Sequence, residues 1–154
     1  MKGRFILNKL RPYERKVFYY ETDKMGIVHH SNYIRIFEEA RVHYLSEAGL
    51  PFPKIEEAGI LMPVLSVEAV YKRPLRFDES FAVYLKIDKF NGTSLHVSYR
   101  IISRDTSLVC TEGCSSHCFT DTELKVVRTK NRYPEIYEIF ARYAGLDFDE
   151  VFTD

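Results

Sequence analysis

The sequence has no long apolar run, no excess of charge of either sign and few cysteines. No stretch approaches the roughly 20 apolar residues that a membrane-spanning helix needs. Segment 1–10 has neither the apolar core of roughly 7–15 residues nor the small-residue cleavage site of a secretory signal. With 22 basic and 22 acidic residues, the formal net charge is zero, which disfavours a nucleic-acid-binding protein. We therefore expect a cytoplasmic protein without a nucleic-acid or membrane partner.

The cysteines are Cys110, Cys114 and Cys118, spaced four residues apart. An odd number of cysteines without a secretory signal argues against a disulfide framework. Their segment reads as a strand, in which residues four apart lie about 13 Å from each other. Thiolates bind zinc at about 2.3 Å, so the three cannot share one ion unless Gly113 bends the strand sharply. We predict ordinary strand thiols and no metal site.

The length of 154 residues and the apolar content of 45% suit a single globular domain. Apolar patterns and turn residues predict strands over 15–20, 61–71, 80–89, 94–103 and 108–120. Helices are expected from near 31 to near 49, over 54–58 and over about 133–144, and the acidic end 147–154 is expected to fray. This order predicts an α+β fold, in which the long helix covers one face of an antiparallel sheet.

The long helix and the loop before it carry the chemical signal. Apolar side chains recur on one helical face at steps of four, three, four and four: Tyr33, Phe37, Ala40, Tyr44 and Ala48. Ser31 is a candidate N-cap, and unpaired amides gather at such a helix start, where they can stabilise an oxyanion. Asp23 and Gly26 form a loop just upstream, so a carboxylate can face the same reacting carbon. The combination is typical of acyl transfer.

The run 21–33, ETDKMGIVHHSNY, resembles the signature of the 4-hydroxybenzoyl-CoA thioesterase family of hotdog-fold acyl-CoA thioesterases. The similarity extends through Phe37, Glu38, Ala40 and Arg41. It implies a hotdog fold, in which an antiparallel sheet wraps around a long central helix. It also implies hydrolysis of acyl-CoA without a cofactor, by a homodimer or homotetramer whose site lies between subunits.

The resemblance assigns the catalytic roles to Asp23 and His30. Asp23 would act as general base or as nucleophile, and the alternative is an Asx-turn residue that only bonds its own backbone. The backbone amide of His30 would polarise the thioester carbonyl, while Val28 and His29 shape the turn. Further substrate contacts are expected from Gly26, Val28, His29, Tyr33, Lys72, Arg73 and Arg76.

The basic cluster of Lys72, Arg73 and Arg76 is expected to meet the phosphates of coenzyme A, the alternative being a solvated turn. The acyl pocket is expected along the helix and the facing strand, at Tyr33, Phe37, Leu61 and Val64. In another branch of hotdog thioesterases a helix carboxylate is catalytic, so Glu38 is the alternative to Asp23, although bracing the helix through Arg41 fits it better.

The alternative functions are hydrolysis of acyl carrier protein thioesters and non-catalytic acyl-CoA binding. The sequence does not specify the acyl group.

Overall fold

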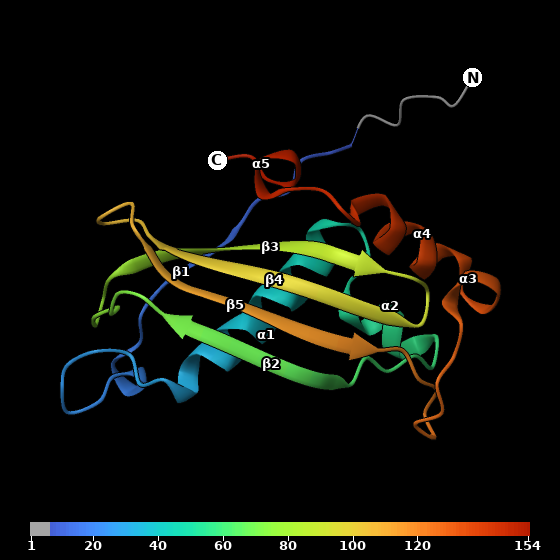
Figure 1. Cartoon of the computed structure of the whole chain (residues 1–154), viewed down its shortest axis with the longest axis horizontal. Helices are drawn as coiled ribbons and strands as arrows, with labels where there is room; N and C mark the ends of the chain where they lie inside the picture. Colours follow the sequence, from blue (N-terminus) through green and yellow to red (C-terminus); the bar gives the residue numbers. More distant parts are fainter. Residues whose placement is uncertain (1–6) are drawn as a thin grey trace.

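A computed structural model describes residues 7–154, so the first six residues of segment 1–10 lie outside the described part. Five strands form one antiparallel sheet in the order β1-β3-β4-β5-β2 (Figure 1). The strands are β1 (Tyr13–Lys16), β2 (Val64–Tyr71), β3 (Ser80–Phe90), β4 (Ser94–Ser103) and β5 (Val109–Cys118). The helices are α1 (Ser31–Glu47), α2 (Phe52–Glu57), α3 (Thr129–Arg132), α4 (Pro134–Tyr143) and α5 (Phe148–Val151), with a 3₁₀ turn, η1, at Tyr19–Glu21.

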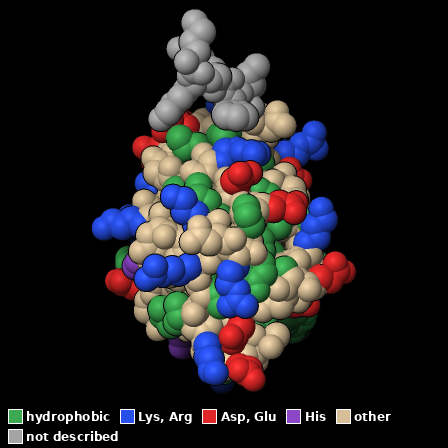
Figure 2. All heavy atoms as spheres, turned by 90° about the vertical axis from the view of Figure 1, so that its right-hand side faces the viewer, with side chains coloured by type: hydrophobic (Ala, Val, Ile, Leu, Met, Phe, Trp, Pro, Cys, Tyr) green, Lys and Arg blue, Asp and Glu red, His purple; other side chains and the backbone are tan. Residues whose placement is uncertain are grey.

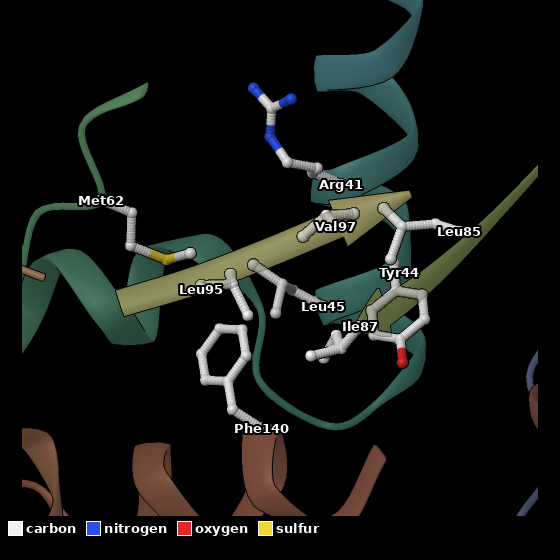
Figure 3. A pocket seen from close by; sticks show the side chains of 9 residues that line it. All are labelled: Arg41, Tyr44, Leu45, Met62, Leu85, Ile87, Leu95, Val97 and Phe140. Carbon is white, nitrogen blue, oxygen red and sulfur yellow. The ribbon is translucent and has the colours of Figure 1, made fainter. Parts of the chain in front are cut away.

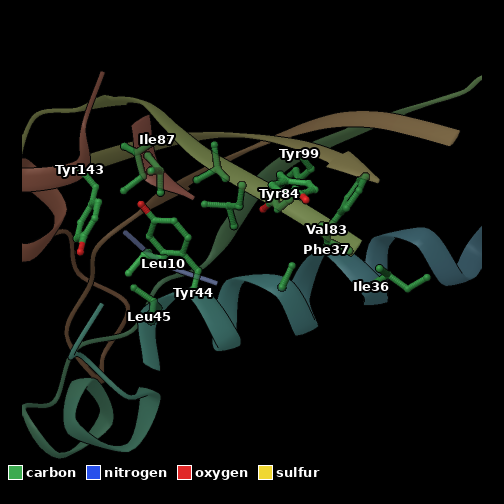
Figure 4. Close-up of a cluster of buried hydrophobic side chains, with 14 of the residues drawn as sticks. Leu10, Ile36, Phe37, Tyr44, Leu45, Val83, Tyr84, Ile87, Tyr99 and Tyr143 are labelled. Atoms are coloured by element: carbon green, nitrogen blue, oxygen red, sulfur yellow. The ribbon is translucent and has the colours of Figure 1, made fainter. Parts of the chain in front are cut away.

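Helix α1 runs along one face of the sheet, and the core fills the space between them (Figures 1 and 4). The apolar stripe predicted for this helix is buried from Tyr33 to Tyr44. Phe37 stacks on Tyr99 of β4 with ring centroids 4.3 Å apart, directly over Gly113 of β5. A Cβ at Gly113 would lie 2.5 Å from the Phe37 ring, so the missing side chain allows helix and sheet to approach closely. This arrangement confirms the expected α+β hotdog fold.

Two details at the start of the chain differ from the sequence-based expectations. The first strand ends at Lys16, and the segment expected to continue it becomes the turn η1, whose Tyr19 and Tyr20 are exposed. Ser31 is not the N-cap of α1, because His30 occupies that position and no side chain caps the helix. The Ser31 hydroxyl lies instead 2.8 Å from Nδ1 of His29. The amides at this helix start therefore receive no hydroxyl cap.

The C-terminal segment is ordered against the sheet, so the expectation of a frayed end is wrong. Val151 and Phe152 are buried, and backbone bonds join Leu10 to Val151 and to Thr153. Lys86 and Arg100 lie over the ring of Phe148, at 5.0 and 4.6 Å from its centroid. Apolar burial outweighs the solvation of this acidic stretch because α5 packs against β3 and the N-terminal segment.

Strand β2 lies at the edge of the sheet and pairs only with β5 among the described strands. Its exposed apolar side chains are Val64, Leu65, Val70 and Tyr71. An edge strand presents unpaired backbone groups, so a long apolar one invites pairing with another strand. On the face that carries α3 and α4, basic, acidic and apolar side chains are interspersed without a large area of one charge (Figure 2). In the described chain no helix is long and apolar enough to span a bilayer.

Candidate active site

The Asp23 loop is a tight turn fixed by its own backbone. The amide of Asp23 donates to the carbonyl of Ile27 at 2.9 Å, and the amide of Gly26 donates to the carbonyl of Asp23 at 2.9 Å. Gly26 has a φ of +76°, a left-handed conformation that a residue with a Cβ rarely adopts. Oδ1 of Asp23 accepts a bond from the amide of Met25 at 2.8 Å, so the Asx-turn considered as an alternative is present. Oδ2 accepts no bond from any described residue and can face a substrate.

The entry into α1 uses two of its amides and leaves the next one free. The amide of Val28 donates to the carbonyl of Leu75 at 2.8 Å, and that of His29 donates to the carbonyl of Glu21 at 2.9 Å. The amide of His30 donates to no acceptor within residues 7–154. An unpaired amide at the positive end of a helix dipole attracts a negatively charged oxygen.

These two features meet at one surface cavity of about 340 Å³. It is lined by six of the residues expected from the sequence: Asp23, Val28, His30, Tyr33, Lys72 and Arg73. The other expected residues lie beside the cavity. Gly26 forms the turn below Asp23, His29 directs its ring nitrogen to Ser31, and Arg76 pairs through its backbone with Ile27.

Two tyrosines form the wall between the loop and β2. The rings of Tyr33 and Tyr71 lie 5.0 Å apart, and the hydroxyl of Tyr71 donates to the carbonyl of His30 at 3.3 Å. Burial raises the pKa of Tyr33 to about 12, so its hydroxyl stays neutral near pH 7. The bond from Tyr71 fixes the carbonyl of His30 and thereby the orientation of the peptide group between His30 and Ser31.

The basic cluster is divided by its ion pairs. Lys72 Nζ lies 3.1 Å from a carboxylate oxygen of Glu112, and both side chains are partly exposed. Arg73 and Arg76 make no ion pair with a described residue, and only Arg73 joins Lys72 at the cavity. Arg73 is therefore the cation at the cavity with the most freedom to meet a phosphate.

A buried ionic cluster behind the loop was not anticipated from the sequence. The guanidinium of Arg15 makes a two-pronged contact with Glu21, with N–O distances of 2.6 and 2.8 Å, and its Nε donates to Glu39 at 2.9 Å. Burial opposes the charge on Glu21, yet Arg15 and the amide of Phe18 hold the pKa of that carboxyl below its ordinary value. The only signal in the sequence was an acidic residue, Glu21, directly after the aromatic run 18–20.

This cluster positions the two catalytic candidates relative to each other. The carbonyl of Glu21 accepts bonds from the amide of His29 and from the side-chain amide of Asn32, at 2.9 and 2.8 Å. Glu21, two residues before Asp23, is thus bonded to the start of α1. Its ion pair with Arg15 joins it to β1, and the contact of Arg15 with Glu39 joins both to the middle of the helix.

Other expected residues lie elsewhere. Phe37 is fully buried in the core, so it does not line an open acyl pocket, because the missing Cβ of Gly113 draws its ring onto the sheet. Glu38 lies 4.0 Å from Arg41 and lines a different cavity from Asp23. Cys110, Cys114 and Cys118 are free thiols, and residues 7–154 contain no cluster of three or more His, Cys, Asp or Glu suited to a metal.

The chain is similar to known proteins along most of its length. Residues 17–142 match the family model described as Thioesterase-like superfamily. A putative esterase of Aquifex aeolicus is 38% identical over 106 residues, which cover 69% of this chain and 81% of that protein. A putative acyl-CoA thioesterase of Bacillus subtilis, YneP, is 31% identical over 130 residues, covering 84% of this chain and 94% of that protein.

A solved structure extends the similarity to the fold. The DHNA-CoA thioesterase of Staphylococcus aureus superimposes with a TM-score of 0.82 at 26% identity, covering 88% of this chain and 91% of that one. The family model spans the Asp23 loop, α1 and strands β2 to β5. The chain therefore belongs to the Thioesterase-like superfamily.

Proposed function

We propose that this protein is an acyl-CoA thioesterase, which converts acyl-CoA and water into a free acid and coenzyme A. The proposal is carried by one observation: the carboxylate of Asp23 and the residue with the unpaired helix-start amide, His30, line the same cavity. Relatives named as acyl-CoA thioesterases support it. The narrower kinship with 4-hydroxybenzoyl-CoA thioesterases, expected from the run 21–33, stays a prediction that a substrate panel tests.

In the proposed reaction the thioester oxygen lies at the amide of His30, where negative charge develops as the carbonyl carbon becomes tetrahedral. As general base, Asp23 takes a proton from the attacking water through its free Oδ2, and the C–S bond then breaks to release the thiolate of coenzyme A. As nucleophile, Asp23 instead attacks the carbonyl carbon, the C–S bond breaks to release the thiolate of coenzyme A, and water hydrolyses the resulting anhydride. Single-turnover hydrolysis in ¹⁸O-labelled water distinguishes these routes, because the label enters the Asp23 carboxyl only after anhydride formation and hydrolysis there.

The decisive variant is Asp23→Asn, which keeps the size of the side chain and the bond from Met25. Loss of a catalytic acid or base typically costs about 10²–10⁴-fold in turnover. Asp105→Asn, an exposed aspartate in the β4–β5 turn, is the matched control and should retain activity. Glu38→Gln tests the helix carboxylate. Near-normal turnover in Asp23→Asn, or a larger loss in Glu38→Gln, would refute the assignment.

The assay needs care because Cys114 is exposed and would react with a thiol reagent. Loss of the thioester ultraviolet absorbance avoids this background. A panel of acyl-CoAs with short, long and aromatic acyl groups separates hydrolysis from mere binding. Binding without release of coenzyme A would favour a non-catalytic acyl-CoA binding protein, and a strong preference for carrier-bound substrates would favour an acyl carrier protein thioesterase.

We assign coenzyme A recognition to Lys72 and Arg73, with Arg76 as an outer contact. Arg73→Glu should raise KM for acyl-CoA and leave KM for a truncated thioester without the nucleotide unchanged, because only the phosphates lose a partner. Arg128→Glu, at an exposed site away from the cavity, is the control. An equal effect on both substrates would contradict the assignment.

We also expect a single-domain, cytoplasmic homo-oligomer, a dimer or a tetramer, whose subunits meet along β2. The exposed apolar edge of this strand supports such pairing. Leu65→Lys should then produce monomers in sedimentation experiments and lower activity at the same time. A monomeric wild-type enzyme with full activity would contradict the expectation.

A further inference from the structure

A second cavity lies farther along α1, on the side of the helix that faces the start of β2. Its volume is about 380 Å³, larger than that of the cavity at Asp23. Its walls are mainly apolar and come from four elements, with Leu45 on α1, Phe52 on α2, Val64 on β2 and His117 on β5. We call it the Arg41 cavity, because Arg41 is the one cation among its lining residues.

Arg41 is an unusual residue for such a place. Its side chain is only 14% exposed, and a guanidinium stays charged at every ordinary pH. Glu38 is the one described carboxylate within 4.0 Å, it is 74% exposed, and the separation is beyond a hydrogen bond. Arg41 also lines a small apolar cavity of about 20 Å³, and Figure 3 shows its guanidinium pointing away from Leu95 and Phe140 on the walls of that cavity.

The protein holds this cation in place without neutralising it. The guanidinium donates to the hydroxyl of Tyr99 at 2.9 Å, which lies 2.6 Å from the hydroxyl of Ser115, itself 2.7 Å from Nε2 of His117. Each of these three partners is buried and uncharged near neutral pH. They orient one side of the guanidinium and leave its other N–H groups for the cavity.

A largely buried charge whose nearest carboxylate is exposed and 4.0 Å away is poorly neutralised, and such a site favours an anion that arrives with apolar surface. A carboxylate suits a guanidinium because its two oxygens match two parallel N–H donors. The apolar walls suit a hydrocarbon chain. A phosphate would leave these walls exposed to water, so a carboxylate on an apolar chain fits best.

We propose that the Arg41 cavity binds the carboxylate end of an apolar chain and thereby selects the acyl groups that the enzyme processes. This rests on the proposed thioesterase function and names a ligand class for it. Two sources share this chemistry: the far carboxylate of an ω-carboxyacyl thioester, and the carboxylate of a free fatty acid product. Arg41 lies eleven residues beyond His30, about 16 Å along the helix. A substrate whose thioester lies at His30 and whose far carboxylate meets Arg41 of the same subunit therefore has a long acyl group.

The substrate source is tested with pairs of acyl-CoAs of equal length that end in either a methyl group or a carboxylate, from short to long. The wild-type protein should prefer the carboxylate member at the matching length by about tenfold or more in kcat/KM. Arg41→Met, which keeps an apolar stem, should remove this preference while retaining turnover of methyl-ended substrates. Arg35→Met, the same change at an exposed position of α1, should leave the preference intact.

The product source is tested by direct binding of decanoate and decanol, measured by calorimetry on the Asp23→Asn protein. Decanoate should bind about tenfold or more tightly than decanol, and Arg41→Met should equalise the two. Glu38→Gln should tighten decanoate binding several-fold, because it removes a like charge from the rim. If Arg41→Met does not fold, Arg41→Lys and Glu38→Gln still decide, since the first should weaken carboxylate selectivity and the second strengthen it.

The outcomes separate this proposal from the proposed function. If decanoate binding depends on Arg41 but the wild-type protein hydrolyses no acyl-CoA, the carboxylate site is supported and the proposed thioesterase function is refuted. Hydrolysis without any carboxylate preference, together with equal binding of decanoate and decanol, would refute the site and keep the enzyme. An equal loss of methyl-ended and carboxylate-ended turnover in Arg41→Met would show a structural role and also refute the proposal.

Discussion

His117 should make the fold sensitive to mild acid. The side chain is 1% exposed, and burial, with Arg41 and His96 nearby, lowers its pKa from 6.5 to about 4. The hydrogen-bond chain gives an independent reason. Arg41 can only donate to Tyr99, and a chain in which Tyr99 donates to Ser115 and Ser115 donates to Nε2 of His117 gives each of these protons an acceptor. In this chain, protonation of His117 would place the N–H of Nε2 against the donating hydroxyl of Ser115.

The difference between the folded and unfolded pKa of His117 determines how the free energy of unfolding changes with pH. Between pH 6.5 and about 4 the unfolded chain binds a proton at His117 that the folded chain does not, so stability falls as the pH falls. Relative to pH 7.5, this single group should cost about 2 kcal/mol at pH 5 and about 3 kcal/mol at pH 4. The contribution is fully present above pH 6.5.

Urea unfolding at pH 7.5, 6, 5 and 4 measures this in the wild-type protein and in His117→Gln, whose side-chain oxygen can still accept from Ser115. Other histidines titrate in both proteins, so the difference between the two curves isolates His117. The variant should be less stable at pH 7.5 and lose about 2 kcal/mol less than the wild type on going to pH 5. Parallel curves would refute the depressed pKa and the directed hydrogen-bond chain.

Three further variants test the packing around the site. Gly113→Ala should cost about 1–3 kcal/mol, because its Cβ would lie 2.5 Å from Phe37 and 2.7 Å from a backbone oxygen; an unchanged melting temperature would contradict this. Arg15→Met should cost about 3–5 kcal/mol in urea, since it leaves the buried Glu21 unpaired, and adding Glu21→Gln should restore part of the loss. Deletion of 147–154 should lower the melting temperature by several degrees by uncovering apolar surface; no change would mean that this end contributes little.

The sequence alone predicted the parts of the molecule that depend on neighbours along the chain. The apolar period of α1, the extent of β4 over 94–103 and the grouping of Asp23, His30 and Tyr33 at one cavity all follow from local spacing. A loop and the helix that it enters cannot lie far apart, so the motif fixed their proximity before any tertiary contact was known. The roles of these residues in catalysis stay predictions.

Only the tertiary structure decided which charged groups are buried and what they contact. Arg15 meets Glu39 across 24 positions, and Arg41 meets Tyr99 across 58. The helical period places Glu39 and Arg41 at the border of the apolar face, where a solvated flank and a buried ion pair have the same pattern. Burial there depends on which strand packs against that border, a long-range property that no local spacing encodes. For the same reason the C-terminal acidic stretch looked frayed until its contact with Leu10 was seen.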